Sequence, residues 1–356
     1  MNRADSPHTA FKQLPVVDVS GLFATDMTQR KATAAVLDNA TRDAGFLYLT
    51  GHGISEAAMA GLKGCARAFF AQSEAEKQRS YIGNSANHSG YVPMGEERFY
   101  NSDEIDAKEA FDVGFELQNP ALARPMLGAN QWPEQEGFRE GVTHYYNQVL
   151  ALSKVLFKGF ALALGLPEHT FVQHVNQPAT QLRLIHYFHN PEQTHDQPGI
   201  GAHTDYEFFT ILLPTSPGLQ VLNGAGEWID APIVPGAFVV NIGDLMEVAS
   251  NGQYVATTHR VKAVSEERYA FPMFCNLDYD TEVKPLAQLT QDQPPRYPTV
   301  ICGEHLFAQT IQTFQYLQAR LQSGEITLPD GAMALSSFGH ATSNDVSAAA
   351  QVRPCN

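Results

Sequence analysis

His203 and Asp205, in the segment GAHTD at 201–205, are residues whose types and spacing could bind a metal ion. Side chains alternate between the two faces of a β-strand, so residues two apart point the same way and can share one ion. The pair alone is weak evidence, because a histidine is more often a hydrogen-bonded structural residue. His259, in the second β-type run ATTHRV at 256–261, is the candidate third ligand.

Two imidazoles and one carboxylate on one octahedral face leave three coordination positions open, which is typical of non-haem Fe(II) oxygenases. A bidentate oxo-acid can occupy two of these positions and O₂ the third. Arg268 follows His259 by nine residues and begins the run RYAFPMF. Its planar guanidinium could grip the distal carboxylate of a five-carbon diacid. A surface arginine is the plain alternative.

The elements that must position these residues are short β runs. From residue 181 onward QLRLIHYF, FFTILL, LQVL, AFVVNI, ATTHRVKAV and RYAFPMFCNL are separated by turn signals such as PTSPG, NGAGE and SNG. This pattern predicts an all-β sandwich or barrel. Before it, strands are expected at 14–19 and 45–49, and helices at 33–43, 56–72 and 137–164. A helix is expected at 303–321, and 84–106 reads as a long irregular segment.

Composition excludes several classes of protein. With 44% hydrophobic and 17% charged residues, the chain should bury a core and not be disordered. The 23 basic and 38 acidic side chains give a formal charge of −15, which opposes sequence-independent binding to nucleic acid. Four cysteines without a C-x-x-C pair suit a reducing compartment. No apolar leader or 18-residue apolar stretch is visible, so a cytoplasmic protein with no membrane partner is expected.

The chain resembles the isopenicillin N synthase-like branch of the Fe(II)/2-oxoglutarate-dependent dioxygenases. The resemblance rests on motifs in the family's order: LPVVDVSGL at 14–22, AGFLYLTGHGI at 44–54, GAHTDY at 201–206, GLQVL at 218–222, VVNIGDLM at 239–246, SNGQYVATTHRV at 250–261 and ERYAFPMF at 267–274. It covers roughly residues 14 to 322. It implies a mainly β fold with flanking helices around a double-stranded β-helix, or jelly roll.

The resemblance also implies roles for individual residues. His203, Asp205 and His259 match the iron ligands, Arg268 matches the arginine that grips 2-oxoglutarate, and Tyr187 matches a tyrosine near this cosubstrate. The expected reaction consumes 2-oxoglutarate and O₂, releases succinate and CO₂, and oxidises a small polar substrate such as an amino acid or a derivative. The residues placed nearest the substrate are Tyr91, Glu97, Arg98, Arg183, Tyr206 and Phe208, each with an ordinary alternative as a surface charge or packing aromatic.

Two departures from the family pattern keep alternatives open. The usual Arg-x-Ser is Arg268-Tyr269-Ala270 here, which removes one hydroxyl, and Ile185-His186 stands where plant relatives commonly carry Asn-Tyr. The bacterial ethylene-forming type is similar in its SGY…GEE segment, in GIGAHTDY and in Arg-x-Ala. An oxidase of the isopenicillin N synthase kind, without 2-oxoglutarate, is the other alternative, and a non-catalytic metal-binding relative is a third.

A single catalytic domain spanning 1–356 is expected. Within it we expect an N-terminal α/β segment at about 14–120, a helical part at 121–180, the iron and 2-oxoglutarate core at 181–280, a C-terminal helical region at 281–322 and a tail at 331–356. Neither the oligomeric state nor the order of the tail follows from the sequence.

Overall fold

The computed structural model describes residues 8–98, 106–188, 199–262, 266–291, 293–329 and 331–335. Its strands are β1 Val16–Asp18, β2 Phe46–Thr50, β3 Gly90–Val92, β4 Lys108–Gly114, β5 Gln181–Tyr187, β6 Ile200–His203, β7 Phe209–Pro214, β8 Leu219–Leu222, β9 Trp228–Asp230, β10 Phe238–Ile242, β11 His259–Val261, β12 Arg268–Cys275, β13 Glu282–Val283 and β14 Val300–Ile301. Its α-helices are α1 Met27–Ala44, α2 Glu56–Phe70, α3 Glu74–Lys77, α4 Phe138–Ala163, α5 Asp244–Ala249, α6 Cys302–Thr313 and α7 Gln315–Ser323.

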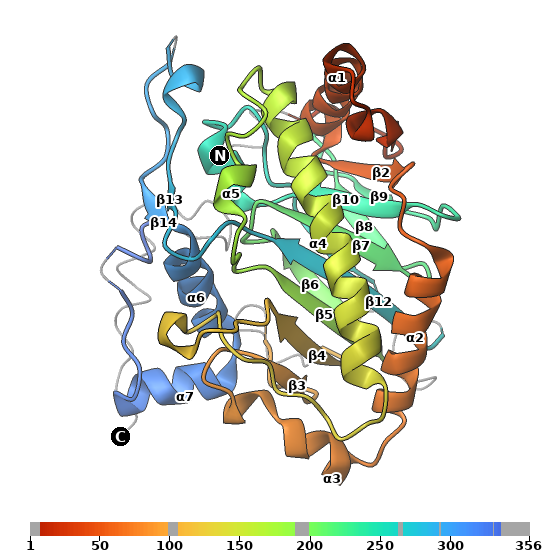
Figure 1. The fold of residues 1–356 in the computed structure, drawn as a ribbon, viewed down its shortest axis with the longest axis vertical. Helices are drawn as coiled ribbons and strands as arrows, with labels where there is room; N and C mark the ends of the chain where they lie inside the picture. The colour runs from red at the N-terminus through yellow and green to blue at the C-terminus, as the bar shows by residue number, and fades with distance from the viewer. Residues whose placement is uncertain are drawn as a thin grey trace.

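Two sheets form the body of the molecule. The larger has the strand order β1-β2-β10-β7-β12-β5-β4-β3 and the smaller has the order β6-β11-β8-β9. Strands far apart in sequence are therefore neighbours, as in β10 between β2 and β7 (Figure 1). This is the mainly β jelly-roll core with flanking helices that the sequence predicts.

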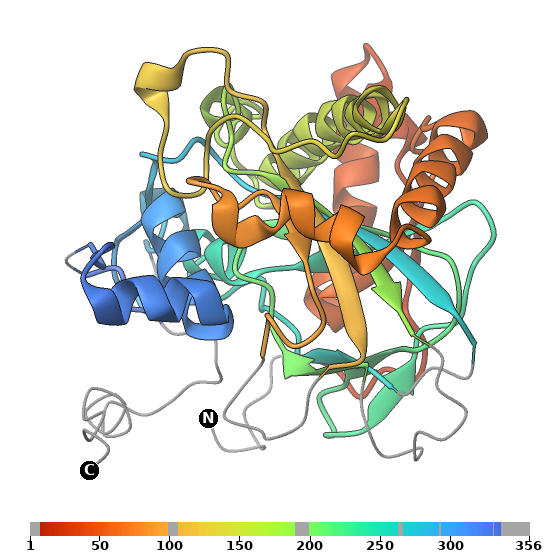
Figure 2. The same cartoon turned by 90° about the horizontal axis from the view of Figure 1, so that it is seen from below.

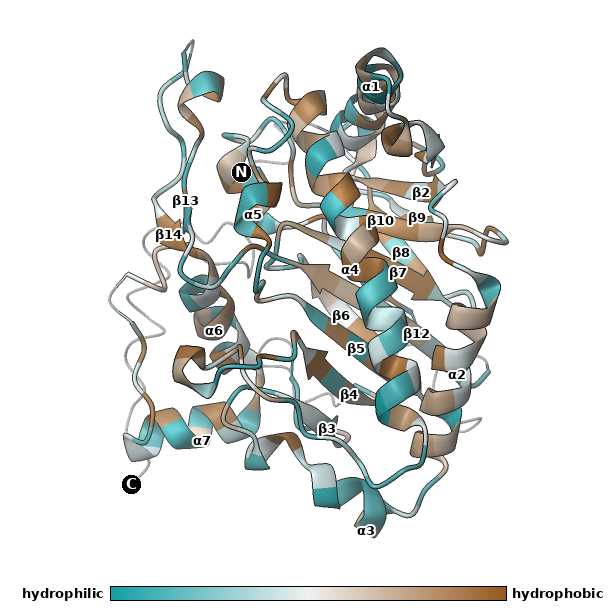
Figure 3. Cartoon of the chain, viewed as in Figure 1, coloured by the Kyte–Doolittle hydropathy of each residue, from teal (hydrophilic) through white to brown (hydrophobic). Residues whose placement is uncertain are grey.

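Helices cover the outer face of the larger sheet. The long helix α4 crosses that face, with α1 and α2 beside it (Figure 1). Figure 3 shows apolar and polar residues mixed along α4, and the side toward the sheet is apolar. There Phe157 packs against Phe209 of β7, with 4.7 Å between ring centroids. The apolar side of α4 thus holds the larger sheet in place by burial.

Strand β5 is buried along its whole length because both of its faces are covered. Leu182 and Leu184 belong to the core beneath the helices, whereas Ile185 and Tyr187 belong to a second apolar cluster on the opposite face. Alternation along one strand therefore sends odd-numbered residues toward the space between the two sheets. The candidate active site lies in this space between the two sheets.

Most expected elements lie near their expected bounds, with three differences. The helix expected at 33–43 is longer and begins at Met27. The helix expected at 303–321 is two helices, because Phe314 adopts extended angles (φ −102°, ψ 124°) and its side chain is buried. The segment 84–106 contains strand β3, and residues 99–105 lie outside the described ranges, as does most of the tail. Figure 2 places α6 and α7 together at one side of the sheets, away from α1 and α2.

None of the helices within the described ranges is long and apolar enough to cross a membrane.

Candidate active site

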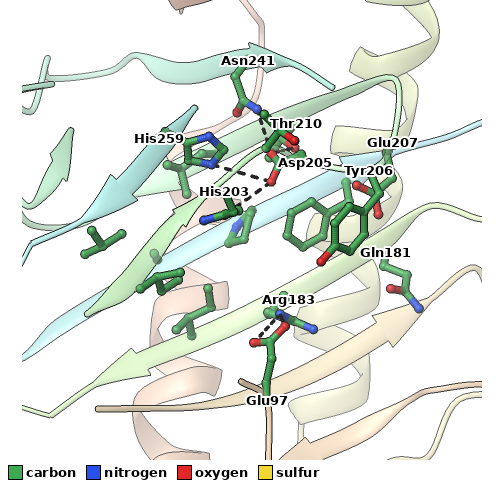
Figure 4. A pocket seen from close by; sticks show the side chains of 18 of the residues that line it. Glu97, Gln181, Arg183, His203, Asp205, Tyr206, Glu207, Thr210, Asn241 and His259 are labelled. Carbon is green, nitrogen blue, oxygen red and sulfur yellow. Dashed lines mark hydrogen bonds and ion pairs between the residues drawn. The ribbon is translucent and has the colours of Figure 1, made fainter. Parts of the chain in front are cut away.

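His203, Asp205 and His259 come together as one group of potential metal ligands. His203 is the last residue of β6, His259 is the first residue of β11, and the two are direct partners across this antiparallel pair. Asp205 lies just beyond β6. Its Oδ1 is 3.8 Å from Nε2 of His203 and 3.7 Å from Nε2 of His259, as Figure 4 shows. Since the three ligand atoms lie within 4.8 Å of one another, the group could hold one ion.

Hydrogen bonds behind the group fix the direction of each ligand. Nδ1 of His203 donates to the carbonyl of Gly201 at 2.8 Å, and Nδ1 of His259 donates to the carbonyl of Thr257 at 3.1 Å. Because a carbonyl can only accept, each Nδ1 must carry the proton, and the unprotonated Nε2 of each ring lies on the side of Asp205. Hydrogen bonds of this kind, from the ring nitrogen that does not face the metal ion, orient metal-binding histidines.

Asp205 is oriented in the same way. Its Oδ2 accepts hydrogen bonds from the hydroxyl of Thr210 and from Nδ2 of Asn241, the latter at 2.7 Å. Oδ1 is thereby left for a metal ion. Asn241 lies on β10 and Thr210 on β7, so the larger sheet orients a ligand that follows the smaller one.

We expect Asn241→Ala to weaken Fe(II) binding by about 10- to 100-fold, because partners of metal ligands typically contribute that much to affinity. Titration of the apoprotein with Fe(II) under anaerobic conditions measures it. Asn223→Ala is the matched control, because Asn223 is as buried as Asn241 but lies outside the cavity. Equal affinities of both variants and the wild type would show that Asn241 does not orient the ligand.

The charge state of the group suits a cation. Burial, with a smaller contribution from the nearby His259, lowers the pKa of His203 to about 4, so the imidazole is neutral near pH 7. Burial by itself raises the pKa of Asp205, but the two imidazoles and the bonds from Asn241 and Thr210 outweigh it, so the net pKa is lowered. Neutral imidazoles and an ionised carboxylate are the forms that bind metal.

The turn after β10 holds the backbone that follows β6. The N–H of Gly243 donates to the carbonyl of Phe208 at 3.0 Å. The N–H of Asp244 donates to the backbone carbonyl of Asp205 at 2.9 Å. A Cβ at Gly243 would lie 2.2 Å from the carbonyl oxygen of Glu207, which backbone cannot accommodate without shifting. Glycine is needed here for this close approach.

Arg268 begins β12 and lies opposite Tyr187 of β5. Only 1% of Arg268 is exposed, and its Nε donates to the carbonyl of Ser216 at 3.2 Å. Nη1 is buried without a hydrogen-bond partner among the described residues. The ring of Tyr187 lies 4.6 Å from the guanidinium carbon, a cation–π contact. A buried guanidinium N–H group that lacks an acceptor fits the carboxylate of a bound diacid.

Arg268, Tyr187 and the three potential ligands line one cavity between the two sheets, with an empty volume of about 900 Å³. Ala270 also lines it, where the family usually has serine. The cavity wall further carries Glu97, Lys108 and Arg183. Lys108 Nζ lies 2.6 Å from Glu97 Oε2, and Arg183 Nη1 lies 2.8 Å from Glu97 Oε1. Arg183 also donates two hydrogen bonds to Asp112, from Nε to Oδ1 at 2.7 Å and from Nη2 to Oδ2 at 2.8 Å.

These pairs keep buried charges compensated. Burial raises the pKa of Glu97, but Arg183 and Lys108 lower it more, to about 2. The carboxylate of Glu97 is therefore ionised throughout the neutral range. Glu207 differs, because burial and the nearby charge of Asp205 raise its pKa to about 8.

Of the residues expected near the substrate, Glu97, Arg183 and Tyr206 line the cavity and the other three do not. Tyr91 packs against Phe69 and its hydroxyl donates to Glu109 at 2.7 Å. Phe208 packs in the core between Phe157 and Phe171. The side chain of Arg98 is exposed, and its Nε donates to the carbonyl of Gly95. Neither proximity in sequence to the metal motif, for Phe208, nor a position in the segment 84–106, for Tyr91 and Arg98, was therefore enough to predict a place in the cavity.

The sequence reasoning missed several cavity residues: Lys108, Gln181, Glu207, Thr210 and Asn241. Strand alternation was a usable signal for Gln181, which shares a face with Arg183, Ile185 and Tyr187. No local signal marked Lys108, because β4 lies next to the segment that reads as irregular.

Comparison with known proteins agrees with this geometry. Residues 14–135 match the family model described as non-haem dioxygenase in morphine synthesis N-terminal, and residues 179–277 match the 2OG-Fe(II) oxygenase superfamily. A homoarginine-6-hydroxylase of Arabidopsis thaliana is 35% identical over 331 residues, covering 86% of this chain and 99% of the relative. An isopenicillin N synthase of Flavobacterium is 31% identical, covering 82% and 94%.

Comparison with solved structures points to the same family of oxygenases. A full-length Neurospora crassa protein in complex with alpha-KG superposes with a TM-score of 0.74 at 26% identity, covering 85% of this chain and 98% of that one. A 2OG-Fe(II) oxygenase family protein of Caulobacter crescentus gives a TM-score of 0.74 at 29% identity, covering 88% and 100%. With its ligand set, its buried arginine and these matches over nearly its whole length, the chain belongs to the 2OG-Fe(II) oxygenase superfamily.

Proposed function

We propose that this dioxygenase hydroxylates a free amino acid or a close derivative, with 2-oxoglutarate as the cosubstrate and succinate and CO₂ as coproducts. The observation that carries this proposal is the shared cavity. It brings His203, Asp205 and His259 together with a buried arginine whose Nη1 lacks an acceptor within the described ranges. A two-histidine, one-carboxylate face leaves positions for the oxo-acid and for O₂.

The residues that line the cavity have different roles in this proposal. His203, Asp205 and His259 hold Fe(II), and Arg268 binds the distal carboxylate of 2-oxoglutarate while Tyr187 packs against its guanidinium. When bound, iron and 2-oxoglutarate supply the oxidising power, and the protein positions the substrate and excludes water. Glu97, Lys108 and Arg183 line the same cavity as an ion-paired group, so this part of the wall is polar.

The substrate class is supported by the named relatives. Homoarginine-6-hydroxylases from Arabidopsis thaliana, rice and soybean are 32–35% identical to this chain. Homoarginine is accordingly the first substrate to test, with arginine, lysine, neutral amino acids and small carboxylates beside it.

We expect homoarginine or another amino acid to stimulate succinate release well above the rate with 2-oxoglutarate alone. The assay starts from an anaerobic preparation with Fe(II) and 2-oxoglutarate, adds O₂ with each candidate, and measures succinate and hydroxylated product. The absence of stimulation by every amino acid in the panel, with stimulation by another compound class, would refute the proposed substrate class.

Oxygen uptake with product formation but without 2-oxoglutarate consumption would instead indicate the oxidase alternative, for which the isopenicillin N synthase relative is the specific observation. In that case Arg268 would bind the carboxylate of the substrate itself.

Ethylene formation is the remaining alternative. Its support is the sequence similarity in the SGY…GEE segment and in Arg-x-Ala. Gas analysis of the headspace during 2-oxoglutarate turnover decides it, and we expect succinate without ethylene as the main outcome.

A further inference from the structure

Glu207 is a cavity-lining carboxyl that the assigned roles do not use. Only 3% of it is exposed. Within the described part of the chain it forms no ion pair, and its one hydrogen bond is to its own backbone N–H. The other carboxylates of the cavity differ. Glu97 is bonded to both Lys108 and Arg183, and Asp205 is bonded to Thr210 and Asn241.

The strand register shows where Glu207 lies along the cavity. On β12 and β5, Arg268 pairs with Tyr187 at one end, and Phe274 pairs with Gln181 at the other. Six residues of strand separate these ends, or roughly 20 Å. The N–H of Phe208 donates to the carbonyl of Cys275, which places the neighbouring Glu207 at the Gln181 end.

The potential metal ligands lie between these two ends. Ile200 at the start of β6 lines the cavity and pairs with Val261 near Arg268, whereas His203 ends the same strand and Asp205 and Glu207 follow it. In Figure 4 Glu207 lies beside Tyr206, at the end of the drawn group opposite His259. If 2-oxoglutarate is bound at Arg268, as proposed above, the end of the cavity at Glu207 is the part left for a substrate.

Within the described residues no cation of the cavity is bonded to Glu207. Lys108 and Arg183 are matched by Glu97 and Asp112. Arg268 is matched by the proposed cosubstrate. A guanidinium or ammonium group of a ligand is the kind of partner that a buried carboxyl group without a bonded cation can accept.

We propose that Glu207 binds the basic group of the substrate, a guanidinium or ammonium at the end of its side chain. This inference rests on the proposed amino acid hydroxylation and narrows the substrate to basic amino acids. Glu97 is less suited to that role, because a substrate cation there would displace an existing bond to Lys108 or Arg183.

The test compares homoarginine with homocitrulline, its neutral ureido analogue of nearly equal shape. We expect the wild-type protein to prefer homoarginine by about 10- to 100-fold in kcat/KM, the range for a hydrogen bond to a charged group. In Glu207→Gln we expect that preference to fall to within about threefold, mainly through a higher KM for homoarginine. An equal loss for both compounds in Glu207→Gln, or an unchanged preference, would overturn the inference.

Glu247→Gln is the matched control, because Glu247 is also buried but lies outside the cavity, on α5. It should keep the wild-type preference. If Glu207→Gln does not fold, the wild-type protein still provides a test. Equal turnover of homoarginine and homocitrulline by the wild type would contradict the binding of a charged side-chain group by Glu207.

Failure of this inference is distinguishable from failure of the proposed function. Amino acid-stimulated succinate release that favours neutral side chains would refute the role of Glu207 and retain amino acid hydroxylation. An absence of stimulation by any amino acid would refute both.

Discussion

Replacement of His203 by alanine is expected to lower substrate-dependent succinate production by at least about 1,000-fold. Loss of an outer partner of a metal ligand typically costs 10- to 100-fold, and loss of the ligand itself should cost more. His203 Nε2 faces Asp205 because its Nδ1 is committed to the carbonyl of Gly201. Apart from His259, which is itself a candidate ligand, no histidine in the described ranges belongs to the group, so no substitute donor is present there.

The variant should remain folded. A catalytic metal site with open positions contributes less to folding than a closed structural site, and His203 lies at the end of a strand. Circular dichroism and thermal unfolding check the fold, and Fe(II) titration checks the site. The matched control is His52→Ala, since His52 is also buried but bonds to the backbone of Gly236 and Ile54 outside the cavity. Wild-type succinate production by His203→Ala would refute the ligand assignment.

Arg268→Ala is expected to raise the KM for 2-oxoglutarate by at least roughly 30-fold. Truncating one partner of a buried, hydrogen-bonded charge pair costs about 2–5 kcal/mol, and each 1.4 kcal/mol is a factor of ten. The guanidinium is buried, stacked on Tyr187 and bonded through Nε to Ser216, so its position is fixed before the diacid binds. Preorganisation of this kind strengthens binding because little side-chain entropy is lost.

Steady-state kinetics at saturating amino acid separates the effect on KM from that on kcat. Arg268→Lys should recover part of the affinity, because it restores the charge without the planar fork. Arg260→Ala is the control, since Arg260 lies on β11, the strand before β12 in the chain, and stacks on Trp228 outside the cavity. An unchanged requirement for 2-oxoglutarate in Arg268→Ala would favour the oxidase alternative.

Much of the fold could be predicted because its signals are local. The β runs after residue 181, the long helix near 137–164 and the strand at 45–49 follow from periodicity and turn residues within a few positions. The break at Phe314 could not be predicted in this way. Its extended backbone agrees with burial of its ring against His88, a residue 226 positions away, at 4.4 Å between ring centroids.

For the candidate site, too, some features follow from the local sequence and others only from the tertiary structure. By itself the sequence indicated the candidate ligands and the arginine that follows, from residue types and spacing. Asp205 lies just beyond β6, so its direction depends on the bonds from Thr210 and Asn241 and not on strand alternation. Only the tertiary structure decided that Tyr91 and Phe208 pack in the core, and that Lys108, Asn241 and Glu207 reach the cavity. Their places depend on the register between strands far apart in sequence and on which face each strand turns inward. No local pattern encodes these non-local pairings, and they set the balance of charge around the substrate.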